Sequence, residues 1–100
     1  MFGKLAEAQK KAEEIKQRLG AISVTGVAAS GKVEVMVDGN KKVKNVTIHP
    51  DLLHIDRKEE LEDLLQIAMH DALEQAEKLS AAEMKSLMGS MMPGIGGLFS

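Results

Sequence analysis

The chain has 100 residues and a formal net charge of −2, and its 44% hydrophobic and 28% charged residues are ordinary for one globular domain. It contains no cysteine, which excludes a disulfide scaffold and thiolate metal ligands. Residues 1–4 lead directly into charged residues, and the longest uncharged stretch, 86–100, is shorter than the roughly 20 apolar residues of a membrane span. We therefore expect a soluble cytoplasmic protein with no contact to a membrane.

The first predicted element is a helix over residues 4–19, which ends at Gly20. Its apolar side chains recur at alternating spacings of three and four, as in a heptad seam. The only aromatic residues are Phe2 and Phe99, so the core must be aliphatic, and a second subunit would help to cover it. We expect a homodimer whose interface contains the seam residues Leu5, Ala8, Ala12, Ile15 and Leu19.

Three strands follow in the prediction. Residues 22–28 form the first strand, and a turn over residues 29–31 leads into a β-hairpin. Valines alternate with other residues over 33–37, Asp38-Gly39-Asn40 supplies a turn that accepts positive φ, and residues 43–48 are rich in β-branched side chains. The alternation slips within the last strand, which predicts a β-bulge near Lys44 and Asn45.

A second long helix is expected after His49-Pro50. Asp56 followed by Glu59 resembles a capping box, and an apolar stripe from Leu61 to Leu79 continues the helical pattern to about Met88. The sequence thus predicts one domain over residues 1–88 and a flexible tail rich in Met, Gly and Pro over 89–100. The methionines near this end suit either an adaptable docking surface or a frayed helix end.

Basic charge is concentrated in the first helix and the hairpin, whereas the chain from Asp51 onward is strongly acidic. Lys4, Lys11 and Arg18 are seven residues apart and form one row of about 21 Å along the first helix. Such a row suits contact with DNA phosphates. It is equally typical of a solvated helix surface with i,i+4 ion pairs, and the charges alone leave both interpretations open. The hairpin lysines are either secondary DNA contacts or protection of an exposed strand edge.

No residue pattern indicates catalysis. The histidines lack metal-ligand spacing, and the glycines near the end of the chain are not followed by a helix, as a phosphate-binding loop requires. The acidic cluster after Asp56 is explained by the preference of helix N-termini for acids. We expect no enzyme activity, catalytic residue, metal, cofactor or small-molecule substrate.

Several segments together resemble one family in the same order along the chain. They are AQKKAEEIKQRL in the first helix, VDGN in the hairpin, IHPDLL at the junction, DRKEELEDLLQIAMHDALEQAE in the second helix and a Met, Gly and Pro tail that ends in Leu-Phe. This sequence is similar to the YbaB/EbfC family of nucleoid-associated DNA-binding proteins.

The resemblance implies an α/β (α+β) fold of order α-β-β-β-α, with a small antiparallel sheet and two long projecting helices in a tweezer-like homodimer. It also implies binding of double-stranded DNA with little sequence specificity, with effects on nucleoid organisation and gene expression. The candidate DNA-binding residues are the row Lys4, Lys11 and Arg18, together with Lys10, Lys16, Lys41, Lys42 and Lys44. The alternative function is that of a homodimeric protein interaction module that does not bind DNA.

Overall fold

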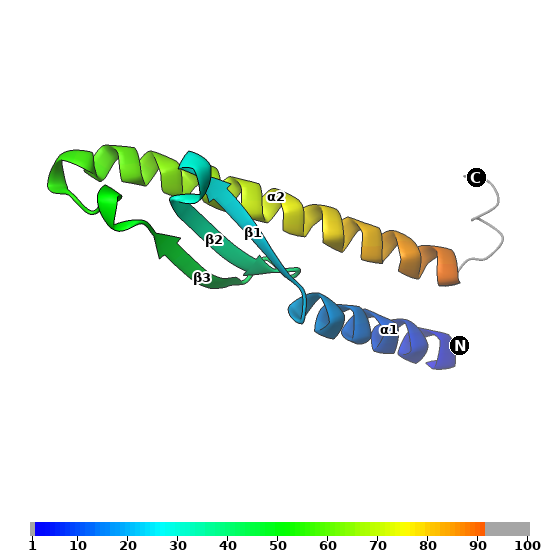
Figure 1. Cartoon of the computed structure of the whole chain (residues 1–100). Coiled ribbons are helices and arrows are strands. Elements are labelled where there is room, and N and C mark those ends of the chain that lie inside the picture. Colours follow the sequence, from blue (N-terminus) through cyan, green and yellow to red (C-terminus); the bar gives the residue numbers. More distant parts are fainter. Residues whose placement is uncertain (1, 92–100) are drawn as a thin grey trace.

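The structure, a computed structural model, describes residues 2–91 and has the element order that the sequence predicts (Figure 1). Its helices and strands are α1 (Phe2–Gly20), β1 (Ser23–Ala28), β2 (Val33–Asp38), β3 (Val43–Ile48) and α2 (Lys58–Met91). The α-β-β-β-α fold is therefore confirmed. Among residues 2–91, neither helix contains a stretch that is apolar enough to cross a membrane.

The three strands form an antiparallel sheet in the order β1-β2-β3. Val35 in the central strand lies opposite Gly26 on one side and Val46 on the other. Between β2 and β3 the register shifts, because Met36 pairs with Asn45 whereas the next residue, Val37, pairs with Val43. Lys44 is the extra residue of β3, and the predicted bulge is confirmed at this position.

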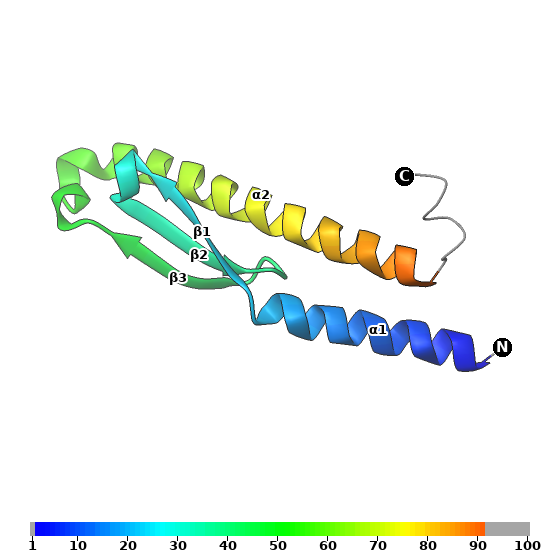
Figure 2. The same ribbon diagram turned by 45° about the vertical axis from the view of Figure 1, so that its right-hand side comes forward.

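The core lies between the sheet and the N-terminal part of α2, which crosses β1 and β2 (Figure 2). The alternating valines of β2 place their side chains on one face of the sheet, and the alanine stripe of α2 packs against them. These residues are completely buried: Val33, Val35, Val37, Ala68, Ala72 and Ala76. Small side chains on both layers allow the helix to approach the sheet closely.

Gly26 on β1 marks the point of closest approach. A Cβ atom at this position would lie only 2.0 Å from the carbonyl oxygen of Ala68. The outer edge of β1 is also tied to the helix, because Gln75 Nε2 donates to the Thr25 carbonyl at 2.9 Å and the Val27 N–H donates to Asp71 Oδ2 at 3.1 Å. The glycine and the alanine stripe of α2 therefore fix the helix at one distance from the sheet.

α1 and the C-terminal part of α2 run side by side beyond the sheet (Figures 1 and 2). The radius of gyration is 18.6 Å, whereas a compact domain of this length would have about 13 Å. α1 is attached at its C-terminal end, where Ile15 and Leu19 are buried and the Gly39 N–H donates to the Leu19 carbonyl at 2.8 Å. The two helices form an arm with long exposed surfaces.

Details of the turns differ from the prediction. In the hairpin turn, Lys41 adopts positive φ (69°) rather than any residue of the segment 38–40. Gly39 is needed for another reason, because a Cβ atom there would lie 2.8 Å from the Leu19 carbonyl oxygen. The expected turn after β1 is present at Ala29–Gly31, where all three residues have positive φ.

The ends of α2 also differ from the prediction. The α-helix begins at Lys58, and Asp56 lies in a preceding 3-10 turn, Ile55–Arg57, instead of at the helix cap. At the other end α2 continues to Met91, so residues 89–91, which belong to the predicted tail, are helical. The remaining tail residues, 92–100, lie outside the described part of the chain, and their flexibility stays a prediction.

Candidate nucleic-acid interface

The turn between β2 and β3 is organised by the buried carboxylate of Asp38. Its Oδ1 atom accepts hydrogen bonds from the backbone N–H groups of Asn40 at 2.8 Å and Lys42 at 2.9 Å. Its Oδ2 atom lies 3.9 Å from Lys44 Nζ. Asp38 thus shapes a tight turn that presents Lys41 and Lys42 at the surface.

This turn contacts the C-terminal end of α1. Asn40 Nδ2 donates to the Lys16 carbonyl oxygen at 2.8 Å, beside the hydrogen bond between Gly39 and Leu19. The contact places the Lys16 backbone next to the turn that carries Lys41 and Lys42. We call these three exposed residues the junction lysines: Lys16, Lys41 and Lys42. Within residues 2–91, Lys16 and Lys42 take part in no ion pair, whereas Lys41 pairs with Glu77 of α2.

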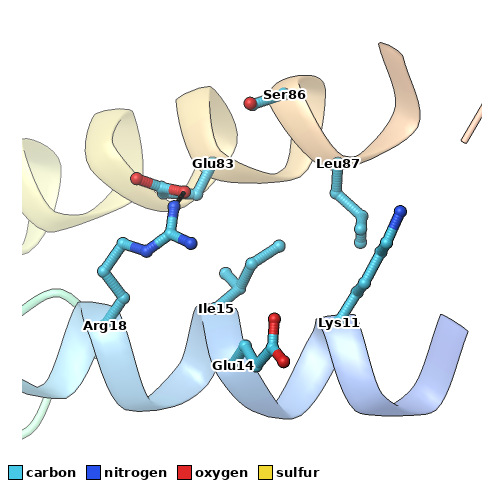
Figure 3. A pocket seen from close by; sticks show the side chains of 7 residues that line it. All are labelled: Lys11, Glu14, Ile15, Arg18, Glu83, Ser86 and Leu87. Atoms are coloured by element: carbon cyan, nitrogen blue, oxygen red, sulfur yellow. Dashed lines mark hydrogen bonds and ion pairs between the residues drawn. The ribbon is translucent and has the colours of Figure 1, made fainter. Parts of the chain in front are cut away.

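The predicted row on α1 lies elsewhere, along a small cleft of about 180 Å³ between α1 and α2 (Figure 3). Arg18 points across the cleft, and its Nη1 atom donates to Glu83 Oε2 at 2.9 Å. Lys11 also borders the cleft and lies 3.8 Å from Glu7. Two members of the row therefore face α2, and nothing is described for the side chain of Lys4.

Lys10, the remaining α1 candidate, is exposed and lies beside a shallow hollow on a different side of the helix from Lys11. Two i,i+4 pairs on α1 could neutralise the row, Glu7 with Lys11 and Glu14 with Arg18. The first pair is present, whereas Arg18 pairs with Glu83 of α2 instead of Glu14. The candidate cations are thus divided among a cleft, a junction and an open helix surface.

The seam on α1 is also divided. Ile15 and Leu19 are buried within this chain, and Ile15 shares the cleft with Leu87 of α2 (Figure 3). Ala8 is half-buried, whereas Leu5 and Ala12 remain exposed. Only the part of the seam away from the sheet is thus free to meet a second subunit.

Within residues 2–91, no group of three or more His, Asp or Glu side chains is arranged to hold a metal ion. His49 has a structural contact instead, because its Nδ1 atom accepts a hydrogen bond from the Asp51 N–H at 3.1 Å. His70 lies 4.0 Å from Glu74 on the exposed surface of α2.

Sequence reasoning missed three acids that determine how the cations are presented. The prediction for the turn uses only the backbone preference of Asp38. An acid that starts a hairpin turn is also a recognisable signal for side-chain hydrogen bonds to the following N–H groups. Glu77 and Glu83 pair with cations of distant elements. These two contacts carry no local sequence signal, because they depend on where α2 passes the hairpin and α1.

Comparison with known proteins places this geometry in a family. A nucleoid-associated protein of Flavobacterium johnsoniae is 35% identical over 98 residues, covering 98% of this chain and 91% of the relative. Nucleoid-associated protein TTHA1599 of Thermus thermophilus is 40% identical over 95 residues, covering 93% and 90%. The fold is similar to that of uncharacterized protein HP0035 from Helicobacter pylori, with a TM-score of 0.74, 22% identity and 90% coverage of both chains.

The profile of the YbaB/EbfC DNA-binding family matches residues 1–91, which span every helix and strand described above. This match confirms the resemblance that the helix, hairpin and junction segments indicated. The chain belongs to the YbaB/EbfC DNA-binding family.

Proposed function

We propose that this protein binds double-stranded DNA as a homodimer, with little sequence specificity, and that it acts at the nucleoid, where it affects DNA organisation and gene expression. Its family and the names of its relatives support DNA as the partner. The observation that carries the proposal is the junction itself, where an Asp38-built turn and the end of α1 present exposed lysines together.

Phosphate contact is the chemistry that suits these lysines. An ammonium group on a flexible stem attracts phosphate as a point charge and does not read base edges. Lys16 and Lys42 form no ion pair within residues 2–91, so contact with phosphate would displace no acidic partner. Binding through such contacts is tolerant of sequence and sensitive to salt.

A homodimer would double these cations, and the sheet suggests where a second copy binds. α2 packs over β1 and β2 and is hydrogen bonded to the outer edge of β1. The third strand, β3, lies mainly outside this contact with α2. On the helix-facing side of β3, Val43 and Val46 remain 47% and 43% exposed. We propose that a second copy covers this strand and the exposed part of the α1 seam, Leu5 and Ala12.

Light scattering at micromolar concentration tests the assembly and should give twice the chain mass of 10.8 kDa. Val46→Glu should shift the protein toward monomers, because a charge would be buried at the interface. Val27→Glu is the matched control, since Val27 is 45% exposed on the opposite face of the sheet. A monomeric wild-type protein would reject the proposed dimer.

DNA binding is tested with two duplexes of unrelated sequence in a fluorescence anisotropy titration. We expect similar affinities for both, and we expect the double variant Lys16→Ala, Lys42→Ala to weaken both by roughly tenfold or more. The control is Lys32→Ala, Lys58→Ala, which removes the same charge from the end of the sheet away from α1. Equal losses in both variants would show that net charge alone matters.

One observation favours the alternative of a protein interaction module. Met84 and Met88 are 48% and 61% exposed on the acidic helix α2, where they offer adaptable apolar contacts to a protein partner. Such binding would persist at salt concentrations that abolish phosphate contacts. Absence of DNA binding even at low salt would make this alternative the leading function.

A further inference from the structure

Two glutamates of α2 reach cations on the elements that carry the candidate DNA contacts. Glu83 pairs with Arg18 of α1 at 2.9 Å, and Glu77 pairs with Lys41 of the hairpin turn. Both pairs join residues that are far apart in the sequence, so they depend on the folded arrangement of α2 against α1 and the turn. Within the fold, α2 thus supplies the anions for two of the candidate DNA-binding cations.

The surroundings of the two members of the Arg18–Glu83 pair differ. The Arg18 side chain is 58% exposed, so an external anion can reach it, whereas the Glu83 side chain is 23% exposed. Glu83 lines the same cleft as the apolar side chains of Ile15 and Leu87 (Figure 3). If Arg18 turned toward a phosphate, the half-buried carboxylate of Glu83 would lose its ion-pair partner. An unpaired charge in such a position is unfavourable, so the Arg18–Glu83 pair opposes phosphate binding.

Carboxylate and phosphate oxygens are alternative acceptors for the same guanidinium group, and both bind it through charge-assisted hydrogen bonds. We propose that Glu83, assisted by Glu77, competes with DNA phosphates for Arg18 and Lys41 and thereby sets the affinity of the protein for DNA below the value that its cations would otherwise give. The inference rests on the proposed function. It assigns to α2 a regulatory role in DNA binding, as a built-in competitor of phosphate.

Glu83→Gln in the full chain is the direct test, because glutamine preserves the size of the side chain and removes its charge. Exposed ion pairs contribute about 0.2 to 1 kcal/mol, so release of two pairs in a dimer should tighten DNA binding roughly 2- to 30-fold. The salt dependence should become steeper, because wild-type binding frees a glutamate that takes up a cation from solution. A thermal melt checks that the variant is folded.

Removal of any acid makes the net charge of the protein less negative and so reduces its repulsion from DNA. The increase in affinity expected for Glu83→Gln must be separated from this general effect of charge. Glu74→Gln is the matched control, since Glu74 is an exposed acid of the same helix whose neighbour at 4.0 Å is His70. The decisive comparison is Glu83→Gln in an Arg18→Ala background, because without Arg18 there is no guanidinium group for which Glu83 and phosphate can compete. We expect Glu83→Gln to give no increase in DNA affinity in the Arg18→Ala background, and we expect Glu74→Gln to give only a small increase.

Each outcome decides between explanations. If Glu83→Gln increased DNA affinity equally with and without Arg18, the inference would be overturned. It would also be overturned if Glu83→Gln left DNA affinity at the wild-type value. The same cycle with Lys41→Ala and Glu77→Gln gives a second, independent measurement should Arg18→Ala abolish binding. Failure of both wild type and Glu83→Gln to bind DNA at low salt would instead reject the proposed function, and the inference with it.

Discussion

Where α2 crosses the sheet, completely buried alanines of the helix pack against completely buried valines of β2, and partly buried leucines of the helix extend this core. Where the same helix runs beside α1, the two helices border a small cleft that is lined by apolar, polar and charged side chains and crossed by the Arg18–Glu83 ion pair. One helix therefore contributes to two regions with different physical properties. The first is tightly packed and buried, whereas the second is polar and partly exposed.

Under the proposed function, stability and DNA binding reside in different regions of the molecule. Close packing at the sheet fixes the fold, and its free energy depends on the shape of small side chains. α1 is attached by the buried side chains of Ile15 and Leu19 and by a few hydrogen bonds at the junction, whereas the partly exposed ion pair of Arg18 contributes little. Cations on the arm can therefore change partners without unfolding the sheet, and the following substitutions test this division.

Gly26→Ala should have the largest effect on stability. Its new Cβ atom would lie 2.0 Å from the Ala68 carbonyl oxygen and 2.9 Å from the Ala72 side chain, so α2 would have to move away from the sheet. We expect a loss of about 3 kcal/mol or more in the free energy of unfolding, measured by urea denaturation. Gly20→Ala is the control, because its nearest atom would be at an ordinary 3.5 Å. Wild-type stability of Gly26→Ala would contradict the packing described here.

Gly39→Ala should act on the arm and leave the sheet intact. The added methyl group would meet Leu19 at 2.8 Å and push α1 away from the hairpin turn. We expect a loss of about 1 to 3 kcal/mol, and faster hydrogen exchange confined to α1 and the turn. Uniformly faster exchange, with the amides of β2 included, would show that the arm and the sheet unfold as one unit.

Arg18→Ala should have the smallest effect on stability. The pair with Glu83 is partly exposed, so its loss should lower the free energy of unfolding by about 1 kcal/mol or less. Thermal denaturation at two salt concentrations would detect this change and show whether salt reduces it. A loss comparable with that of Gly39→Ala would mean that the ion pair, rather than the junction contacts, attaches α1.

The parts of the fold that local patterns encode were predictable from the sequence. Alternating valines specified β2, the slip in β3 located the bulge at Lys44, and the alanine stripe gave the buried face of α2. The role of Gly26 was not predictable, because its neighbour in space is Ala68 of a helix whose position no local pattern reveals.

The candidate site was only partly predictable for the same reason. Sequence spacing correctly places Lys11 and Arg18 on one side of α1, but it cannot show that this side faces α2. Likewise, the contact between Asn40 and Lys16 brings the hairpin lysines to α1 only in the folded chain. The sequence predicts the hairpin lysines only as secondary contacts, and they are part of the interface that we propose at the junction.

The salt dependence of DNA affinity tests the central proposal most directly. If Lys16 and Lys42 contact phosphates in both subunits of a dimer, their replacement by alanine should remove about four phosphate contacts. The slope of log K against log salt should then become less steep by about 0.9 × 4, between three and four, whereas Lys32→Ala with Lys58→Ala should leave it nearly unchanged. A slope that stays at the wild-type value after loss of Lys16 and Lys42 would contradict DNA binding at the junction of α1 and the hairpin.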